Sequence, residues 1–229
     1  MSPDKQLPSP RFMALTALAC TALFLTFPRL DLIASGWFYA PAHGFVLDNY
    51  PLTDFVHNHL GWLAFGSGWL IWLIGRLVNS ALETRDWRRK AAYIALVLVL
   101  GPGLLVNTVF KDHWGRARPA QIEPFGGQAQ FTPAWIPSDQ CNANCSFVCG
   151  DSSVGFSLLA LAFLANHPRR WFIAATVIGG ALGLMRMAQG GHFLSDVVFS
   201  FFAVYFAAWL LHRVLFPNPG PGNRSDRTV

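Results

Sequence analysis

Long apolar runs separated by polar segments make up most of the chain. Roughly 20 apolar residues are needed for a helix to cross a bilayer, and several runs approach that length. We expect six spans, at about residues 12–27, 60–78, 91–110, 152–165, 171–187 and 192–216. The pattern predicts an all-α fold: an integral membrane bundle of six transmembrane helices, forming a single membrane-embedded domain over residues 1–229.

The polar segments between these runs differ in kind. Residues 30–59 mix aromatic residues with prolines and suit an interfacial loop with short helical pieces, while residues 83–90 read as a short basic loop. The longest polar stretch, residues 111–150, is rich in Pro, Gly, Asn and Gln and predicts an ordered loop between the third and fourth helices. Gly101-Pro102-Gly103 is expected to kink the third span near its middle.

Composition supports a membrane protein and argues against nucleic acid as a partner. The 229 residues are 53% hydrophobic and only 13% charged, whereas soluble domains carry about a quarter charged residues. The net charge of +5 does not come from a basic patch interleaved with stacking aromatics. The cations gather at the ends of the spans, where they set topology. Nothing in the pattern indicates an oligomeric state.

The cations also predict an orientation. If the N-terminus is cytoplasmic, twelve of the 17 Lys and Arg residues lie on the inner side, which favours an orientation with both termini cytoplasmic. Four of the five outer cations fall in two segments, residues 111–118 and the turn around Arg186. Cations kept on the disfavoured side are candidates for function. The outer five are Arg29, Lys111, Arg116, Arg118 and Arg186.

The loop after the third span holds three of the four cysteines, Cys141, Cys145 and Cys149, and the fourth, Cys20, lies in an apolar run. In an oxidising compartment a Cys141–Cys145 bridge can form, although the spacing does not prove the pairing. A zinc site is poorly supported because no matching cluster completes four ligands.

The segment from Arg186 to Asp196 carries a candidate reactive group. If His192 and Asp196 lie on one helix, their i, i+4 spacing puts them on one face. The carboxylate would then hold one imidazole nitrogen and leave the other basic, with Arg186 placed to clamp an anion. A polar helix hairpin at the membrane surface, with Arg186 snorkelling and His192 capping, is the alternative.

Three outward-facing segments are expected to meet on one rim of the bundle. They are residues 111–119, the start of the fourth span at Cys149-Gly150-Asp151-Ser152, and the turn from Arg186 to Asp196. Together they offer cations, the free backbone N–H groups of a helix N-terminus, and a histidine beside a carboxylate. This combination predicts a phosphate-binding site that contains a nucleophile.

The spacing resembles that of the type 2 phosphatidic acid phosphatase superfamily, which includes the vanadium haloperoxidases. The family pattern is Lys-x6-Arg-Pro, then Pro-Ser-Gly-His, then Ser-Arg-x5-His-x3-Asp. The elements occur in order at span boundaries within residues 90–200. The first is complete, and the third has Met185 in place of serine. The matching residues are Lys111, Arg118, Pro119, Arg186, His192 and Asp196.

The second element departs from the family pattern, because Val148-Cys149-Gly150-Asp151 stands where Pro-Ser-Gly-His is usual. The family's general-acid histidine is therefore replaced by Asp151. Asp151 could be a carboxylic acid with a raised pKa that protonates the leaving group, or only the N-cap of the fourth span. His113 is a third candidate for the proton donor. Some lipid A phosphatases that resemble this superfamily also carry an acidic residue here.

The resemblance implies an enzyme that needs neither a metal nor another cofactor. Lys111, Arg118 and Arg186, with Gly150 and Ser152 at the helix N-terminus, would bind the phosphoryl group. His192 would form a phosphohistidine, with Asp196 stabilising the imidazolium and Asp151 as the candidate acid. Arg116 lies off the fixed motif positions and is expected to solvate the loop.

The substrate implied is a lipid phosphate held in the bilayer at the periplasmic face: lipid A, undecaprenyl diphosphate or phosphatidylglycerophosphate. A lipid phosphotransferase would share every residue named. The remaining alternative is a non-catalytic relative or transporter, in which Arg186 and Asp196 form a gating ion pair.

Overall fold

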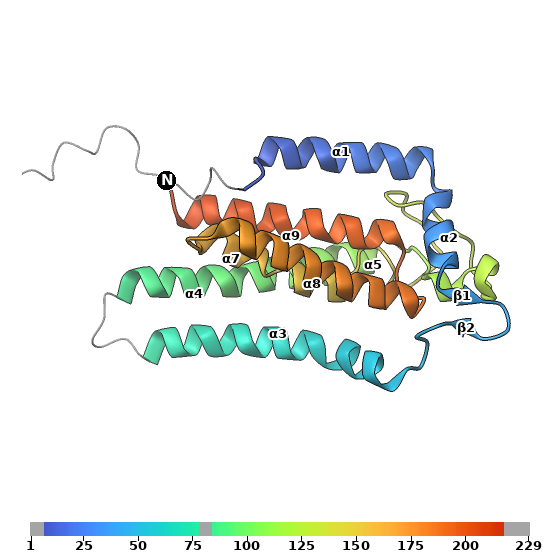
Figure 1. The fold of residues 1–229 in the computed structure, drawn as a ribbon, viewed down its shortest axis with the longest axis horizontal. Helices are drawn as coiled ribbons and strands as arrows, with labels where there is room; N and C mark the ends of the chain where they lie inside the picture. Colours follow the sequence, from blue (N-terminus) through green and yellow to red (C-terminus); the bar gives the residue numbers. More distant parts are fainter. Residues whose placement is uncertain (1–6, 78–83, 218–229) are drawn as a thin grey trace, which may run out of the picture.

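A computed structural model describes residues 7–77 and 84–217. The end of the predicted second span, Glu83, and the tail cations Arg224 and Arg227 lie outside the described residues. Within them the chain is largely helical (Figure 1). The elements are α1 (Pro10–Thr26), α2 (Arg29–Gly36), β1 (Tyr39–Ala40), β2 (Gly44–Phe45), α3 (Pro51–Leu77), α4 (Thr84–Leu98), the π-helix η2 (Val99–Phe110), α5 (Lys111–His113), the 3₁₀ turns η3 (Pro119–Gln121) and η4 (Glu123–Phe125), α6 (Gly150–Phe156), α7 (Leu159–Leu164), α8 (Pro168–Ala188) and α9 (Leu194–Leu215).

Three of the described helical stretches are long and apolar enough to cross a membrane: Asp86–His113, Pro168–Ala188 and Leu194–Leu215. The pair α1 and α2, bent by 85° at a short break, would make a fourth. The stretch Gly150–Leu164 is apolar but shorter. The prediction of a helical membrane protein is confirmed, and the number of six spans stays a prediction.

The long helices run side by side, and the connecting elements that carry the motifs gather at one end of the bundle (Figure 1). That end holds α2, the β1–β2 hairpin, in which Tyr39 pairs with Phe45, and the 111–150 loop. The two ends of the described chain lie at the opposite end (Figure 1), where the Tyr205 hydroxyl donates a hydrogen bond to the Pro8 carbonyl at 2.7 Å.

Close helix packing in the middle of the bundle depends on small residues. A Cβ added at Gly155 in α6 would lie 2.6 Å from the Cα of Gly179 in α8. The backbones of these two helices therefore approach closely, as small residues allow in membrane bundles. On the other side, the Tyr93 hydroxyl of α4 donates to the Ala208 carbonyl of α9 at 3.0 Å. These contacts hold α4, α6, α8 and α9 together in the bundle that carries the site at one end.

The structure corrects two of the predicted boundaries. α3 begins at Pro51, so the second half of the predicted interfacial loop is helical. The basic segment after residue 83 belongs to α4 rather than to a loop. Around Pro102 the helix widens into the π-helix η2 and continues to Lys111. Proline cannot donate its backbone hydrogen bond, and local widening accommodates it within the helix.

Candidate active site

The turn between α8 and α9 places Arg186 and His192. Gly190 has a φ of +68°, a left-handed conformation that glycine adopts without steric cost. At Gly191 an added Cβ would lie 2.6 Å from the Nη2 atom of Arg186, so glycine leaves room for the guanidinium to fold over the turn. α9 begins only at Leu194. The expectation that His192 opens the last helix was therefore wrong.

The hydrogen bond of His192 determines which ring nitrogen is free. Its Nδ1 atom lies 2.7 Å from the Ser146 carbonyl oxygen and 3.6 Å from Oδ2 of Asp196. A carbonyl can only accept, so Nδ1 carries the proton and Nε2 carries the lone pair. The predicted role of Asp196 as the direct partner of His192 is corrected, because the backbone of the loop fixes the tautomer.

Asp196 instead belongs to a buried ion network. Its Oδ1 atom lies 2.6 Å from Nη1 of Arg116, whose Nη2 lies 2.8 Å from Oδ2 of Asp31 in α2. The Oδ2 atom of Asp196 accepts from the Ser146 hydroxyl at 2.6 Å and from the Phe193 N–H at 2.8 Å. The Arg116 side chain is completely buried. Our expectation that Arg116 solvates the loop was wrong.

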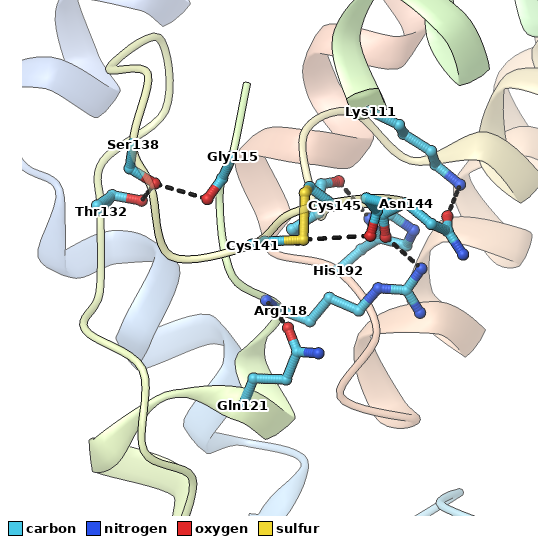
Figure 2. The surroundings of a disulfide bond; sticks show 12 residues. Lys111, Gly115, Arg118, Gln121, Thr132, Ser138, Cys141, Asn144, Cys145 and His192 are labelled. Carbon is cyan, nitrogen blue, oxygen red and sulfur yellow. Dashed lines mark hydrogen bonds between the residues drawn. A yellow bond between two sulfur atoms is a disulfide. The ribbon is translucent and has the colours of Figure 1, made fainter. Parts of the chain in front are cut away.

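Lys111 and Arg118 converge on one loop residue, Asn144 (Figure 2). Lys111 Nζ donates to the Asn144 side-chain oxygen at 3.3 Å, and Arg118 Nη2 donates to the Asn144 carbonyl at 2.9 Å. Asn144 lies in the short loop closed by the Cys141–Cys145 disulfide, which confirms the predicted pairing. The disulfide thus holds the residue that positions two of the candidate phosphate-binding cations.

The electrostatics of the site keep His192 neutral. Burial lowers the pKa of His192 well below its usual value of 6.5, and the charges of Lys111, Arg186 and Arg118 lower it further. Burial and the neighbouring Arg186 also lower the pKa of Arg118. A neutral imidazole with its Nε2 lone pair among cations is poised to attack an electrophile that carries negative charge.

Arg186 is held from α3 as well as from its own turn. Its Nη1 atom donates to Oε1 of Gln189 at 2.7 Å, and Nε2 of Gln189 donates to Thr53 Oγ1 at 3.0 Å and to Asp54 Oδ1 at 2.9 Å. The Nε atom of Arg186 lies 3.2 Å from Oδ2 of Asp151. α3 therefore takes part in the site, although its sequence carries none of the family motifs.

The residues of the second motif are placed differently from expectation. A Cβ at Gly150 would lie 2.9 Å from Lys111 Nζ, so glycine allows the lysine to approach the start of α6. The Ser152 hydroxyl donates to the Gly179 carbonyl at 2.7 Å and is not available to a phosphate. Burial raises the pKa of the Cys149 thiol to about 12, which leaves it uncharged.

Asp151 matches neither of the roles first considered. α6 begins at Gly150 with Cys149 as its N-cap, so Asp151 lies inside the first turn. Its Oδ2 atom is 2.7 Å from Nδ1 of His57 and 3.2 Å from Nε of Arg186. The hydrogen bond with His57 and the positive charge of Arg186 favour the ionised carboxylate over the neutral acid. His113, the third candidate, is exposed and directs Nδ1 at the Thr108 and Val109 carbonyls.

The motifs therefore found the cations and His192 but missed the residues that hold them. The sequence did point to Arg116, because it is a cation on the outer side of the membrane, where Lys and Arg are disfavoured. No pattern singled out Asn144 or Ser146, which lie in an irregular loop, or His57 and Gln189. Within the described residues no group of three or more His, Cys, Asp or Glu side chains could hold a metal ion.

Opening the disulfide is expected to weaken phosphate binding. In a Cys141→Ser, Cys145→Ser variant, Asn144 would no longer be fixed against Lys111 and Arg118. Hydrogen bonds to charged groups contribute about 1.5–3 kcal/mol, so we expect KM to rise about 10-fold with a smaller change in kcat. Steady-state kinetics on a lipid phosphate would measure both.

Cys20→Ala is the matched control for this variant, since Cys20 is a free thiol in α1, remote in sequence from the loop. A reductant should reproduce the effect in the wild-type protein and have none on the double variant. An unchanged KM after removal of the disulfide would show that the loop holds Asn144 without it.

The PAP2 superfamily model matches residues 91–219. A lipid A 4'-phosphatase of Francisella tularensis subsp. novicida is 44% identical over 203 residues, which is 84% of this chain and 89% of the relative. A lipid A 4'-phosphatase of Rhizobium leguminosarum is 31% identical over 211 residues, 84% of this chain and 91% of the relative. No solved structure matches the chain significantly.

The chain belongs to the PAP2 superfamily. The prediction of a membrane lipid phosphatase, made from the motifs, is confirmed by these relatives together with the apolar helices. A transporter or other non-catalytic protein is thereby disfavoured.

Proposed function

We propose that the protein removes the 4'-phosphate from lipid A in the bacterial inner membrane. The observation that carries this proposal is the 44% identity to a lipid A 4'-phosphatase over most of both chains. The site supports it, because three cations surround a neutral histidine at one end of a helical bundle. A phosphate on a lipid whose acyl chains stay in the bilayer would meet this end at headgroup depth.

In the proposed reaction His192 attacks phosphorus through Nε2, and Lys111, Arg118 and Arg186 bind the phosphoryl oxygens. Their charges offset the negative charge of the phosphoryl group in the transition state. Nδ1 stays hydrogen bonded to the Ser146 carbonyl, while Asp196 lies 3.6 Å away and stabilises the imidazolium that forms. Water then hydrolyses the phosphohistidine.

We further propose a bundle of six transmembrane helices in one domain, with both termini cytoplasmic and the site on the periplasmic face. The excess of Lys and Arg in the segments at the opposite end from the site supports this orientation. An oxidising periplasm would also suit the Cys141–Cys145 disulfide in the 111–150 loop.

The test is the release of phosphate by the purified protein in detergent, with a chelator present, from a panel of lipids. The panel contains bis-phosphorylated lipid A, lipid A without the 4'-phosphate, phosphatidylglycerophosphate and undecaprenyl diphosphate. We expect only the first to be hydrolysed rapidly, and mass spectrometry should show loss of the 4'-phosphate. Preference for another lipid would contradict the substrate. Loss of the 4'-phosphate without inorganic phosphate, only when an acceptor lipid is added, would identify a phosphotransferase.

A further inference from the structure

The site lacks the family's histidine at position 151, but α3 brings another histidine into contact with Asp151, the residue that replaces it. Nδ1 of His57 lies 2.7 Å from Oδ2 of Asp151. The two residues are 94 positions apart in the sequence and come from α3 and α6. The Asp151 carboxylate also lies against Arg186. The His57 imidazole is therefore connected through Asp151 to Arg186, one of the candidate phosphate-binding cations.

The free edge of His57 is open to a substrate. The side chain is 34% exposed, compared with 13% for Asp151. With Nδ1 held by the carboxylate, Nε2 is the remaining nitrogen, and no hydrogen bond to it is found in the described part of the chain. A carboxylate on one ring nitrogen fixes the orientation of the ring and directs the other nitrogen outward.

An apolar cavity of about 300 Å³ lies between α3, α4 and the helices α6 to α8. Leu60 and Ala64 line it from α3, and Val154 and Leu158 line it from α6 and its junction with α7. The α3 residues are three and seven positions after His57, and the others are three and seven positions after Asp151. On α3, and on α6 as far as Val154, such spacings share a helix face, so His57 and Asp151 lie on helix faces that lead into the cavity.

This arrangement places different groups near the phosphoryl side and near the lipid side of a bound phosphate ester. The cations and His192 occupy the side where phosphorus would be held. With its helix face continuing into the apolar cavity, His57 would face the oxygen that joins the phosphate to an apolar lipid body. An alkoxide is a poor leaving group unless it is protonated as it departs, and a positioned acid supplies that proton.

We propose that His57 is the proton donor to the leaving lipid oxygen and that Asp151 positions it, which rests on the proposed function. As the bond between His192 Nε2 and phosphorus forms, the bond from phosphorus to the lipid oxygen breaks. The proton on His57 Nε2 moves to that oxygen, which leaves as an alcohol. Neutral His57 then accepts a proton from the water whose oxygen attacks phosphorus. The bond between phosphorus and His192 Nε2 breaks, which leaves inorganic phosphate, neutral His192 and protonated His57.

The experiment compares two leaving groups in a His57→Asn variant. The asparagine amide nitrogen can replace Nδ1 against Asp151 but cannot act as an acid. For lipid A we expect the first turnover to slow by about 10²–10⁴-fold, the usual contribution of general acid catalysis. For p-nitrophenyl phosphate we expect the burst of nitrophenolate to be nearly unchanged, because this weakly basic group leaves without protonation.

His59→Asn is the matched control, since His59 lies on the exposed face of the same helix and its Nδ1 contacts the Phe55 carbonyl. It should leave both reactions unchanged. Equal losses on both substrates in His57→Asn would show a structural role and overturn the proposal, as would no loss on either. If the wild-type protein prefers another lipid phosphate over lipid A, the proposed substrate fails, and the same comparison with that lipid still decides the role of His57.

Discussion

Replacing His192 by asparagine is expected to slow the first turnover on lipid A by about 10⁴-fold or more, in line with the loss of a nucleophile in other enzymes. The fold should survive the substitution. The asparagine amide can replace Nδ1–H and donate to the Ser146 carbonyl, which His192 contacts at 2.7 Å. Burial and nearby cations hold the pKa of His192 well below 6.5, so one neutral side chain replaces another.

Rapid-quench measurement with ³²P-labelled lipid would follow both the phosphorylated protein and the released phosphate, and thermal unfolding in detergent would check the fold. His113→Asn is the control, because His113 is exposed near Lys111 and contacts only carbonyls of its own helix among the described residues. It should retain full activity, which would also remove it as a proton donor. Labelled protein or substantial turnover in the His192 variant would refute the nucleophile.

The parts of the site that the sequence predicted are those whose spacing is local. Lys111 and Arg118 lie at the end of one helix and in the loop after it, and Arg186 and His192 flank one turn. A short segment can satisfy these relations, so a motif records them. The membrane helices were predictable for a similar reason, since the bilayer demands long apolar runs.

The contacts that support these residues join distant segments, and no spacing encodes them. Arg116 meets Asp31 across 85 positions, and His57 meets Asp151 across 94. The start of α3 at Pro51 was missed because aromatic and turn residues hide the helical pattern there, although proline is common in a first helical turn. The placement of His192 was wrong because Asp196 caps the Phe193 N–H and so starts α9 after the histidine.

Arg116→Ala is expected to give the largest loss of stability, about 3–5 kcal/mol, because it removes one partner of a buried ion pair. The guanidinium pairs with both Asp31 and Asp196. It also donates to the Thr132 carbonyl at 2.8 Å and stacks 4.2 Å from the Phe193 ring centroid. Without Arg116, the buried carboxylates of Asp31 and Asp196 would lose the positive charge that lies between them. Arg116→Lys should recover little, since an ammonium cannot make these divergent contacts.

The free energy of unfolding, measured by denaturant titration in detergent micelles, would check this prediction. Arg88→Ala, at an exposed arginine of α4, is the control and should change little. In a double-mutant cycle, Arg116→Ala with Asp31→Ala should cost less than the sum of the single changes, because the second change removes a carboxylate that the first left unpaired. Additive losses in the free energy of unfolding would mean that the two side chains do not interact. The cycle therefore tests whether the loop that carries Arg116 and Arg118 is anchored to α2 through the buried pair of Arg116 and Asp31.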